Sequence, residues 1–314
     1  MSKAVFAAAL AACVWIVQAN GQPGPHRSAG PPDPGADLIT LAVGDVSLTV
    51  DVNMGARIVS FKIGSQEVLS PNTVNRQFFG SSLWLSPEGK WNGHGVIDRA
   101  PYRMKGHEAM SLELHSQPDN RRGFLVTKYF QGLSQDTAIQ IRYTIKNIAD
   151  SVQEVAPWEV TRVPTGGLAF FPKRNPADDP QKNAVYPVPL IVDSSGLIWY
   201  PYDSSTEAPQ KLFANGGEGW VAYARGGILF IKAFPLIDPS SAAPHEKNVE
   251  LYVDKAKTYM ELENQGRYQR LKPGEELTYS VKWYVRKLPP RIPVTVGNMA
   301  LVNFVRAIVR NHPL

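Results

Sequence analysis

The chain between residues 38 and 286 is a series of short runs in which apolar and polar residues alternate. Such alternation places successive side chains on opposite faces of an extended chain and predicts half-buried β-strands. Val, Ile, Tyr, Trp and Phe fill these runs, in keeping with the composition of strands. We expect strands at residues 38–43, 46–52, 56–63, 67–69, 109–116, 124–131, 137–147, 154–163, 196–200, 220–224, 227–234, 248–254, 258–263 and 276–286.

Turn signals such as Gly-Asp, Asn-Met-Gly and Gly-Ser separate these runs and indicate hairpins between sequential strands. Helical periodicity is confined to the last segment, where Met299, Val302, Val305 and Ile308 recur at a spacing of three to four residues. Many antiparallel strands with one terminal helix predict an all-β protein, a large antiparallel β-sandwich with a helix over residues 298–311.

The N-terminus has a different pattern. Residues 2–3 give a basic start, residues 4–17 are apolar, and small residues end at Ala19. This order is typical of a secretory signal peptide over residues 1–19, and the apolar run is short for a membrane span. The segment Leu-Ala-Ala-Cys at residues 10–13 also resembles a lipoprotein processing site, which would leave a lipid anchor on Cys13. Both forms of processing stay open.

The remaining chain divides into three parts. Residues 20–37 are rich in Pro and Gly and predict a disordered linker. Residues 38–290 form the expected sandwich, and residues 291–314 form a helical tail that packs on it. The folded part contains no cysteine and hence no disulfide framework. The predicted signal peptide leads us to expect a periplasmic or secreted protein, tethered to a membrane only if Cys13 carries a lipid. Export without disulfides is compatible with a bacterial periplasm or cell surface.

The net charge of +5 is spread along the chain, so nucleic-acid binding has little support. The sequence contains neither a His/carboxylate or Cys cluster with metal-ligand spacing nor a phosphate-binding glycine loop. We expect no cofactor and no metal. Calcium bound by distant loops stays open.

Three ordered motifs carry a resemblance to a known family. Residues 55–61 read G-A-R-I-V-S-F and lead to Gly64 and Glu67, residues 262–265 read L-E-N-Q, and residues 271–275 read L-K-P-G-E. Together they resemble the galactose-mutarotase-like superfamily over residues 40–288. The segment 156–163 resembles a poorly characterised bacterial branch of it. The resemblance implies a β-sandwich that holds a sugar in an open cleft.

The resemblance also implies a general base at Glu263, within L-E-N-Q, but leaves the general acid open. The histidine of the family's middle strand is replaced in this chain by Trp158 and Glu159. Mutarotation needs a base at the anomeric hydroxyl and an acid at the ring oxygen. Glu261 and Gln265 share parity with Glu263 on one strand, so the three side chains line one face.

The strand 154–163 permits two arrangements. If the face with Trp158 and Arg162 lines the cleft, it offers a ring for stacking and an arginine for a polar or carboxylate group. If the other face lines the cleft, Glu159 and Glu263 form an acid–base pair. Alternation alone does not choose between them. We take Glu263 and Glu159 as the catalytic candidates, and the sugar-binding candidates are Arg57, Trp84, Trp91, Trp158, Arg162, Glu261 and Gln265.

Two functions follow. The first is a carbohydrate-binding protein that acts as a sugar epimerase or mutarotase with an altered general acid. The alternative is a non-catalytic carbohydrate-binding or interaction module of the cell envelope. An accessory domain of a polysaccharide lyase or glycoside hydrolase is disfavoured, because the chain contains no catalytic helical domain.

Overall fold

Strands form where the sequence alternates, because each run can turn its apolar side chains towards a second layer. Strand β2 (Val46–Asp51) and strand β8 (Phe124–Leu133) alternate strictly between buried and partly buried positions. The computed structural model describes residues 37–91, 95–175, 191–192, 196–202, 204–205 and 209–311. The predicted signal peptide, Cys13 and nearly all of the predicted linker lie outside the described residues.

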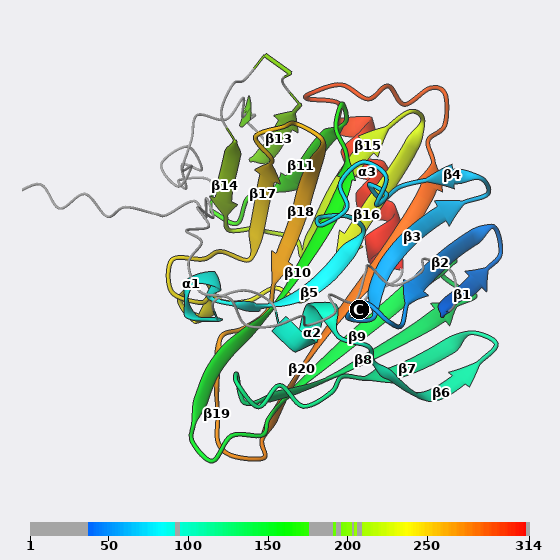
Figure 1. Cartoon of the computed structure of the whole chain (residues 1–314). Helices are drawn as coiled ribbons and strands as arrows, with labels where there is room; N and C mark the ends of the chain where they lie inside the picture. The colour runs from blue at the N-terminus through cyan, green and yellow to red at the C-terminus, as the bar shows by residue number, and fades with distance from the viewer. Residues whose placement is uncertain are drawn as a thin grey trace, which may run out of the picture. The chain divides into compact units, whose positions relative to one another are not determined.

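Two ten-stranded antiparallel sheets make up the fold (Figure 1). Eight strands follow one another across the first sheet, from β1 at one edge to β14 at the other. Two short strands, β4 (Gln66–Glu67) and β19 (Gln269–Leu271), pair with β3 and β10. The order of the eight is β1 (Leu38–Val43), β2, β3 (Arg57–Ile63), β5 (Ser81–Ser86), β10 (Gln153–Pro164), β18 (Tyr259–Gln265), β17 (Val249–Val253) and β14 (Gln210–Ala214).

The second sheet contains both long and short strands, and its longest members lie at its centre. Its order is β12 (Ile191–Val192), β13 (Leu197–Pro201), β11 (Leu168–Pro172), β15 (Trp220–Arg225), β16 (Ile228–Ala233), β20 (Glu276–Lys287), β9 (Ala138–Asn147), β8, β7 (Ser111–His115) and β6 (Arg103–Glu108).

Most predicted strands are confirmed within one or two residues at each end, and the sandwich class is confirmed. Of the strands that the pattern missed, β5, β11 and β6 do not alternate in burial, whereas β14 alternates between buried and partly buried positions and was missed as well. Every residue of β5 and of β11 is buried, and every residue of β6 is exposed. Burial on both faces, or on neither, removes the period of two that reveals a strand.

The predicted terminal helix is confirmed as α3 (Met299–Asn311). Its buried residues Leu301, Val302 and Val305 join the core, and Figure 1 shows it across β15, β16 and β20. Two short helices, α1 (Glu88–Trp91) and α2 (Gly95–Arg99), and a 3-10 turn, η2 (Pro239–Ser241), lie in connections. Among the described residues, no helix combines the length and the apolar composition that a membrane crossing needs.

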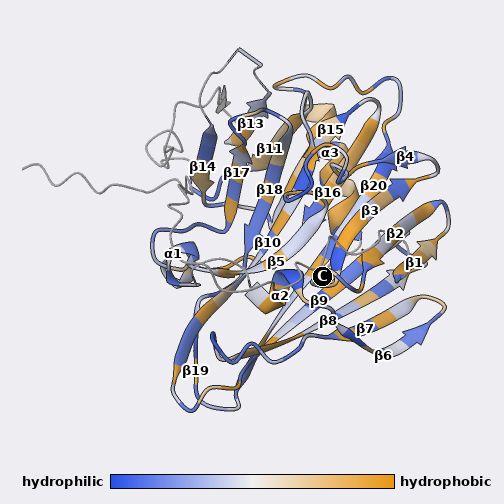
Figure 2. Ribbon diagram, in the orientation of Figure 1, coloured by the Kyte–Doolittle hydropathy of each residue, from blue (hydrophilic) through white to orange (hydrophobic). Residues whose placement is uncertain are grey.

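The core lies between the two sheets. Phe61 of the first sheet packs against Phe230 and Trp283 of the second, with ring centroids 5.6 and 5.3 Å away. Figure 2 shows hydrophobic and hydrophilic residues alternating along many strands of both sheets. Each strand of the first sheet therefore has an inner face towards the second sheet and an outer face turned away from it.

Candidate functional site

The register between β10 and β18 decides which candidate side chains share a face. Trp158 lies opposite Gln265, Val160 opposite Glu263, and Arg162 opposite Glu261. Directly opposed residues of an antiparallel pair project to the same side. Trp158, Arg162, Glu261, Glu263 and Gln265 therefore all belong to one face of the first sheet.

Glu159 belongs to the other face, and its contacts identify that face as the inner one. Its carboxylate accepts hydrogen bonds from the hydroxyl of Tyr143 at 2.6 Å and from the indole of Trp283 at 3.2 Å, both in the second sheet. Lys232 of β16 forms an ion pair with it at 3.0 Å, and both side chains are fully buried. Burial lowers the pKa of Lys232, and the charge of Glu159 opposes that effect.

This arrangement settles the choice that alternation left open. The expected acid–base pair of Glu159 and Glu263 does not form, because the two carboxylates lie on opposite faces of the first sheet. Glu159 instead holds the two sheets together. The Trp158 face is the outer one, and the candidate site is built there.

Strands β17 and β14 extend the outer face with three further side chains. Across the sheet, Lys211 of β14 is opposite Tyr252 of β17, and Tyr252 is opposite Glu261. In the next row, Glu250 of β17 is opposite Glu263. We call these residues together with those of β10 and β18 the outer-face cluster, namely Trp158, Arg162, Lys211, Glu250, Tyr252, Glu261, Glu263 and Gln265.

Glu263 is bonded through both of its carboxylate oxygens. Its two carboxylate oxygens lie 2.7 and 2.8 Å from the Lys211 ammonium, and the indole of Trp158 donates to it at 2.8 Å. Lys211 also contacts the carboxylate of Glu250 at 2.7 Å. Burial disfavours the charge of Lys211, but the two carboxylates outweigh it and raise the pKa of Lys211.

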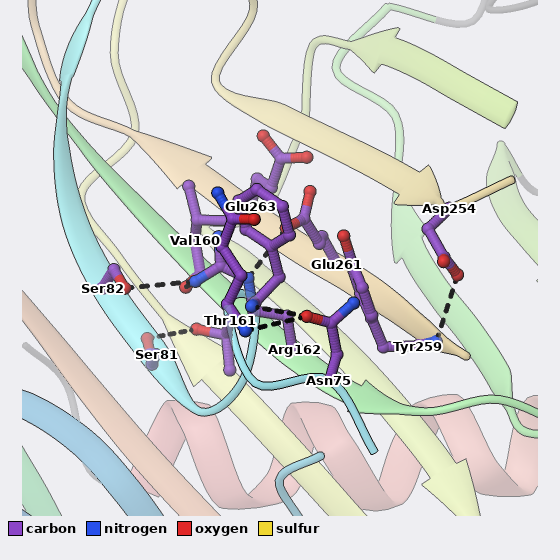
Figure 3. Close-up of polar contacts among 12 residues, drawn as sticks. Asn75, Ser81, Ser82, Val160, Thr161, Arg162, Asp254, Tyr259, Glu261 and Glu263 are labelled. Atoms are coloured by element: carbon purple, nitrogen blue, oxygen red, sulfur yellow. Dashed lines mark hydrogen bonds and ion pairs between the residues drawn. The ribbon is translucent and has the colours of Figure 1, made fainter. Parts of the chain in front are cut away.

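Arg162 holds the second carboxylate of β18. Its Nε donates to Glu261 at 2.8 Å and its Nη1 to the hydroxyl of Ser82 at 3.1 Å (Figure 3). The guanidinium lies over the ring of Trp84, 4.7 Å from its centroid, and 5.8 Å from that of Phe78. A planar cation between aromatic rings and a carboxylate suits the chemistry of arginine.

The pKa of Glu261 is raised to about 7. Burial is the main cause, the charge of Arg162 opposes it, and the neighbouring charge of Glu263 adds to it. Burial likewise holds the pKa of Glu250 well above its ordinary value. Three carboxylates face two cations in the cluster, so a proton retained near neutral pH balances the charge.

Within the described part of the chain, three buried atoms of the cluster have no hydrogen-bond partner, namely Nη2 of Arg162, Oε1 of Gln265 and Oε2 of Glu250. The last of these is ion-paired with Lys211, so among the described residues the first two are without any partner. The amide nitrogen of Gln265 donates to Glu250 at 2.6 Å, which orients its side chain towards the cluster. A buried polar atom without a partner is unfavourable and indicates a place for a water molecule or a ligand.

The expectation of an open ring on Trp158 needs correction. Trp158 is 2% exposed and Trp84 7%, and their rings meet edge to face with centroids 5.3 Å apart. Packing between strands β10 and β5 closes both rings. The partly exposed rings near the cluster are Phe78, Phe213 and Tyr252.

Two other sugar-binding candidates are engaged elsewhere. Arg57 is buried and pairs with Asp98 at 3.0 Å, with its guanidinium 4.7 Å above the ring of Phe79. Trp91 packs edge to face against Phe124 of the second sheet, with centroids 5.2 Å apart. Neither contact links these residues to Glu261 or Glu263.

Sequence reasoning missed Lys211, Glu250 and Tyr252. Glu250 and Tyr252 share parity within a predicted strand, which was the available signal for that pair. Lys211 lies in β14, which was not predicted. Its contact with Glu263 spans 52 positions in sequence and arises only from the order of strands in the sheet.

The chemistry of the cluster is that of proton transfer and hydrogen bonding. Glu261 and Glu263 occupy adjacent positions on one face of β18, about 7 Å apart along the strand. One titrates near neutral pH and the other is held by a lysine and an indole. Within the described ranges, no three His, Cys, Asp or Glu side chains are placed to hold a metal ion.

Solved structures with this architecture define the class. A galactose mutarotase related enzyme from Lactobacillus acidophilus superimposes with a TM-score of 0.55 at 11% identity, covering 83% of this chain and 100% of that one. A candidate aldose 1-epimerase from Escherichia coli K12 gives 0.53 at 13% identity, covering 80% and 99%. The fold is therefore galactose-mutarotase-like.

A family model described as "Domain of unknown function (DUF4380)" matches residues 65–286, and the chain belongs to this family. The match begins before β5 and ends within β20, so it spans β5, β10, β17 and β18 with all their outer-face residues. A search among curated proteins found no match.

Proposed function

We propose that the outer-face cluster binds a carbohydrate and exchanges protons with it, so that the protein interconverts the anomers of a sugar. The observation that carries the proposal is the pair Glu261 and Glu263, which lie on one face of β18 with different hydrogen-bond partners. Likeness of fold to proteins described as mutarotase-related or epimerase-like supports a carbohydrate ligand.

The two carboxyl groups would take different roles. Glu263, which lies 2.7 Å from the Lys211 ammonium, accepts the proton of the anomeric hydroxyl, whose oxygen then forms the double bond to C1. The bond between C1 and the ring oxygen breaks, and the ring oxygen takes a proton from Glu261. After rotation about C1–C2, the reverse steps close the ring in the other anomer and return both protons.

Glu261 suits the role of the acid because its pKa of about 7 lets it give up and regain a proton near neutral pH. In this proposal Glu261 takes the role of general acid, which a histidine has in the galactose-mutarotase-like superfamily. Its carboxylate accepts a hydrogen bond from Nε of Arg162 at 2.8 Å, and its side chain is 8% exposed.

The test is anomer interconversion of glucose and galactose, followed by NMR in the full chain and in Glu261→Gln and Glu263→Gln. We expect acceleration by the wild type and a loss of about 100-fold or more in each variant. Glu276→Gln, at an exposed carboxyl of β20, is the matched control and keeps full activity. Equal rates in all four proteins would contradict the enzymatic proposal.

One observation favours the alternative, a binding module without catalysis. Three contacts from Lys211 and Trp158 occupy the oxygens of Glu263 and reduce its freedom to accept a proton. In this case sugars bind and shift the NMR signals of the indole groups near the cluster, yet no anomer interconverts faster. The same titration therefore separates the two functions.

We further propose that the protein is exported, from the pattern of residues 1–19. Mass spectrometry of the full chain expressed in a bacterium distinguishes the two forms of processing. A mature chain that starts at residue 20 indicates ordinary cleavage, and a lipidated chain that starts at Cys13 indicates an anchor. An uncleaved chain in the cytoplasm would contradict export.

A further inference from the structure

The ammonium of Lys211 occupies a site of unusual composition on the outer face. It contacts three carboxylate oxygens, two of Glu263 at 2.7 and 2.8 Å and one of Glu250 at 2.7 Å. Lys211 lies on β14, the edge strand of the first sheet, and its stem extends over β17 to reach β18. A residue of an edge strand thus supplies a charge to the middle of the cluster.

Aromatic rings complete the surroundings of this ammonium. Its nitrogen lies 5.2 Å from the ring centroid of Phe213, 5.4 Å from that of Trp158 and 6.0 Å from that of Tyr252. Carboxylates combined with several ring faces are the usual means by which proteins recognise organic ammonium groups. The site is therefore built for an ammonium, and Lys211 is its present occupant.

Two buried atoms on the same face of the sheet lack a partner within the described residues and indicate what else a ligand would supply. Oε1 of Gln265 is an acceptor without a donor, and Nη2 of Arg162 is a donor without an acceptor. Along the paired strands β10 and β18, Gln265 lies on one side of Glu263, and Arg162, opposite Glu261, lies on the other. Hydroxyl groups of a molecule that spans both positions could satisfy the two atoms. A sugar offers such hydroxyls at several positions.

The cluster contains more acidic than basic side chains, so it can accept a further cation by giving up the proton that it holds near neutral pH. Glu250, Glu261 and Glu263 exceed Arg162 and Lys211 by one charge when all are ionised. The side chain of Lys211 is 16% exposed, whereas those of Glu250 and Glu263 are fully buried. Its exposure and its flexible stem make it the member of the cluster that can leave its place.

We propose that the sugar bound on this face carries an amino group, whose ammonium takes the position of Lys211 between Glu250 and Glu263. This inference rests on the proposed carbohydrate function and names the class of sugar. A uronic acid would meet three carboxylates instead, and a neutral sugar would leave the ammonium position to Lys211.

The first experiment compares galactosamine, galactose, N-acetylgalactosamine and galacturonate, and the corresponding glucose series, in NMR titrations of the full chain. We expect the amino sugar to bind at least ten-fold more tightly than the neutral sugars, with the uronate weakest. Binding of sugars without preference for the amine overturns this inference alone. Binding of no sugar in either series overturns the proposed function as well.

The second experiment removes the internal occupant. Lys211→Met should raise the affinity for galactosamine at least ten-fold and leave that for N-acetylgalactosamine unchanged. Lys255→Met removes an exposed positive charge outside the cluster and should change neither affinity. An unchanged affinity for galactosamine in folded Lys211→Met would overturn the inference, as would an equal gain for butylammonium, which lacks the sugar.

Lys211→Met leaves two buried carboxylates without their cation, and the variant can fail to fold for that reason. In that case galactosamine added during refolding should restore the native circular dichroism, and galactose should not. Lys211→Arg keeps the positive charge and should show no gain in galactosamine affinity. Failure of the amino sugar to restore folding, or a gain in Lys211→Arg, contradicts the proposal.

Discussion

The indole of Trp158 on β10 donates a 2.8 Å hydrogen bond to the carboxylate of Glu263 on β18, and both side chains are buried. The bond joins one of the seven tryptophans of the chain to the residue that the L-E-N-Q segment predicted as a base. The bond fixes the orientation of the indole, whose ring packs edge to face against Trp84.

The contribution of this bond can be measured. Trp158→Phe keeps an aromatic ring but removes the donor from a buried carboxylate, so we expect the free energy of unfolding to fall by about 1–3 kcal/mol. Urea denaturation of Trp158→Phe, Glu263→Gln and the double variant forms a double-mutant cycle. Strictly additive losses would show that the two side chains do not interact as described.

Arg162 should control the ionisation of Glu261. Its charge opposes the rise that burial imposes on the pKa of Glu261, which stands at about 7. Arg162→Met removes this opposition, so the titration midpoint should move further upwards, as measured by NMR of glutamate labelled at the carboxyl carbon. Arg142→Met, at an exposed position of β9, should leave the midpoint in place. A downward shift in Arg162→Met would contradict the assignment.

The inner pair of Glu159 and Lys232 should matter for stability. Because both charges are fully buried, Lys232→Met leaves a carboxylate without its cation and should lower the free energy of unfolding by about 3–5 kcal/mol. Adding Glu159→Gln to that variant should recover part of the loss, because no unpaired charge then remains. Thermal or urea denaturation provides the measurement, and a double variant less stable than either single one would refute the pairing.

Lys128 of β8 should make stability depend on pH above neutrality. Burial lowers the pKa of this lysine to about 7, the charge of Asp98 opposes that effect and the charge of Arg57 adds to it. Its ammonium donates to the carbonyl oxygen of Gly55 at 2.6 Å. The unfolded chain holds the proton up to about pH 10.4.

Between these two pKa values the unfolded state binds more protons than the native state, so the contribution of Lys128 to stability rises with pH. The slope is at most about 1.4 kcal/mol per pH unit, and below pH 7 it vanishes because both states are protonated. Urea denaturation at pH 7 and pH 9 should show this rise in the wild type and a smaller one in Lys128→Met. An equal rise of the free energy of unfolding in both proteins would show that titratable groups other than Lys128 cause it.

Periodicity within the sequence determined the fold class, most strands, the terminal helix and the parity of residues along each strand. The side-by-side placement of Glu261, Glu263 and Gln265 on one face of β18 could be read from alternation alone. Such features are local, since a period of two or of three to four residues decides which side chains a single element can bury.

Tertiary structure alone decided which face of β10 is turned away from the second sheet, and therefore that Glu159 is a core residue and Arg162 a partner of Glu261. It also brought Lys211 and Glu250 to Glu263. Strand order and register depend on how two whole sheets pack, and residues more than a hundred positions apart take part, as in the pair Trp158 and Glu263. Alternation along one strand contains no information about its neighbours.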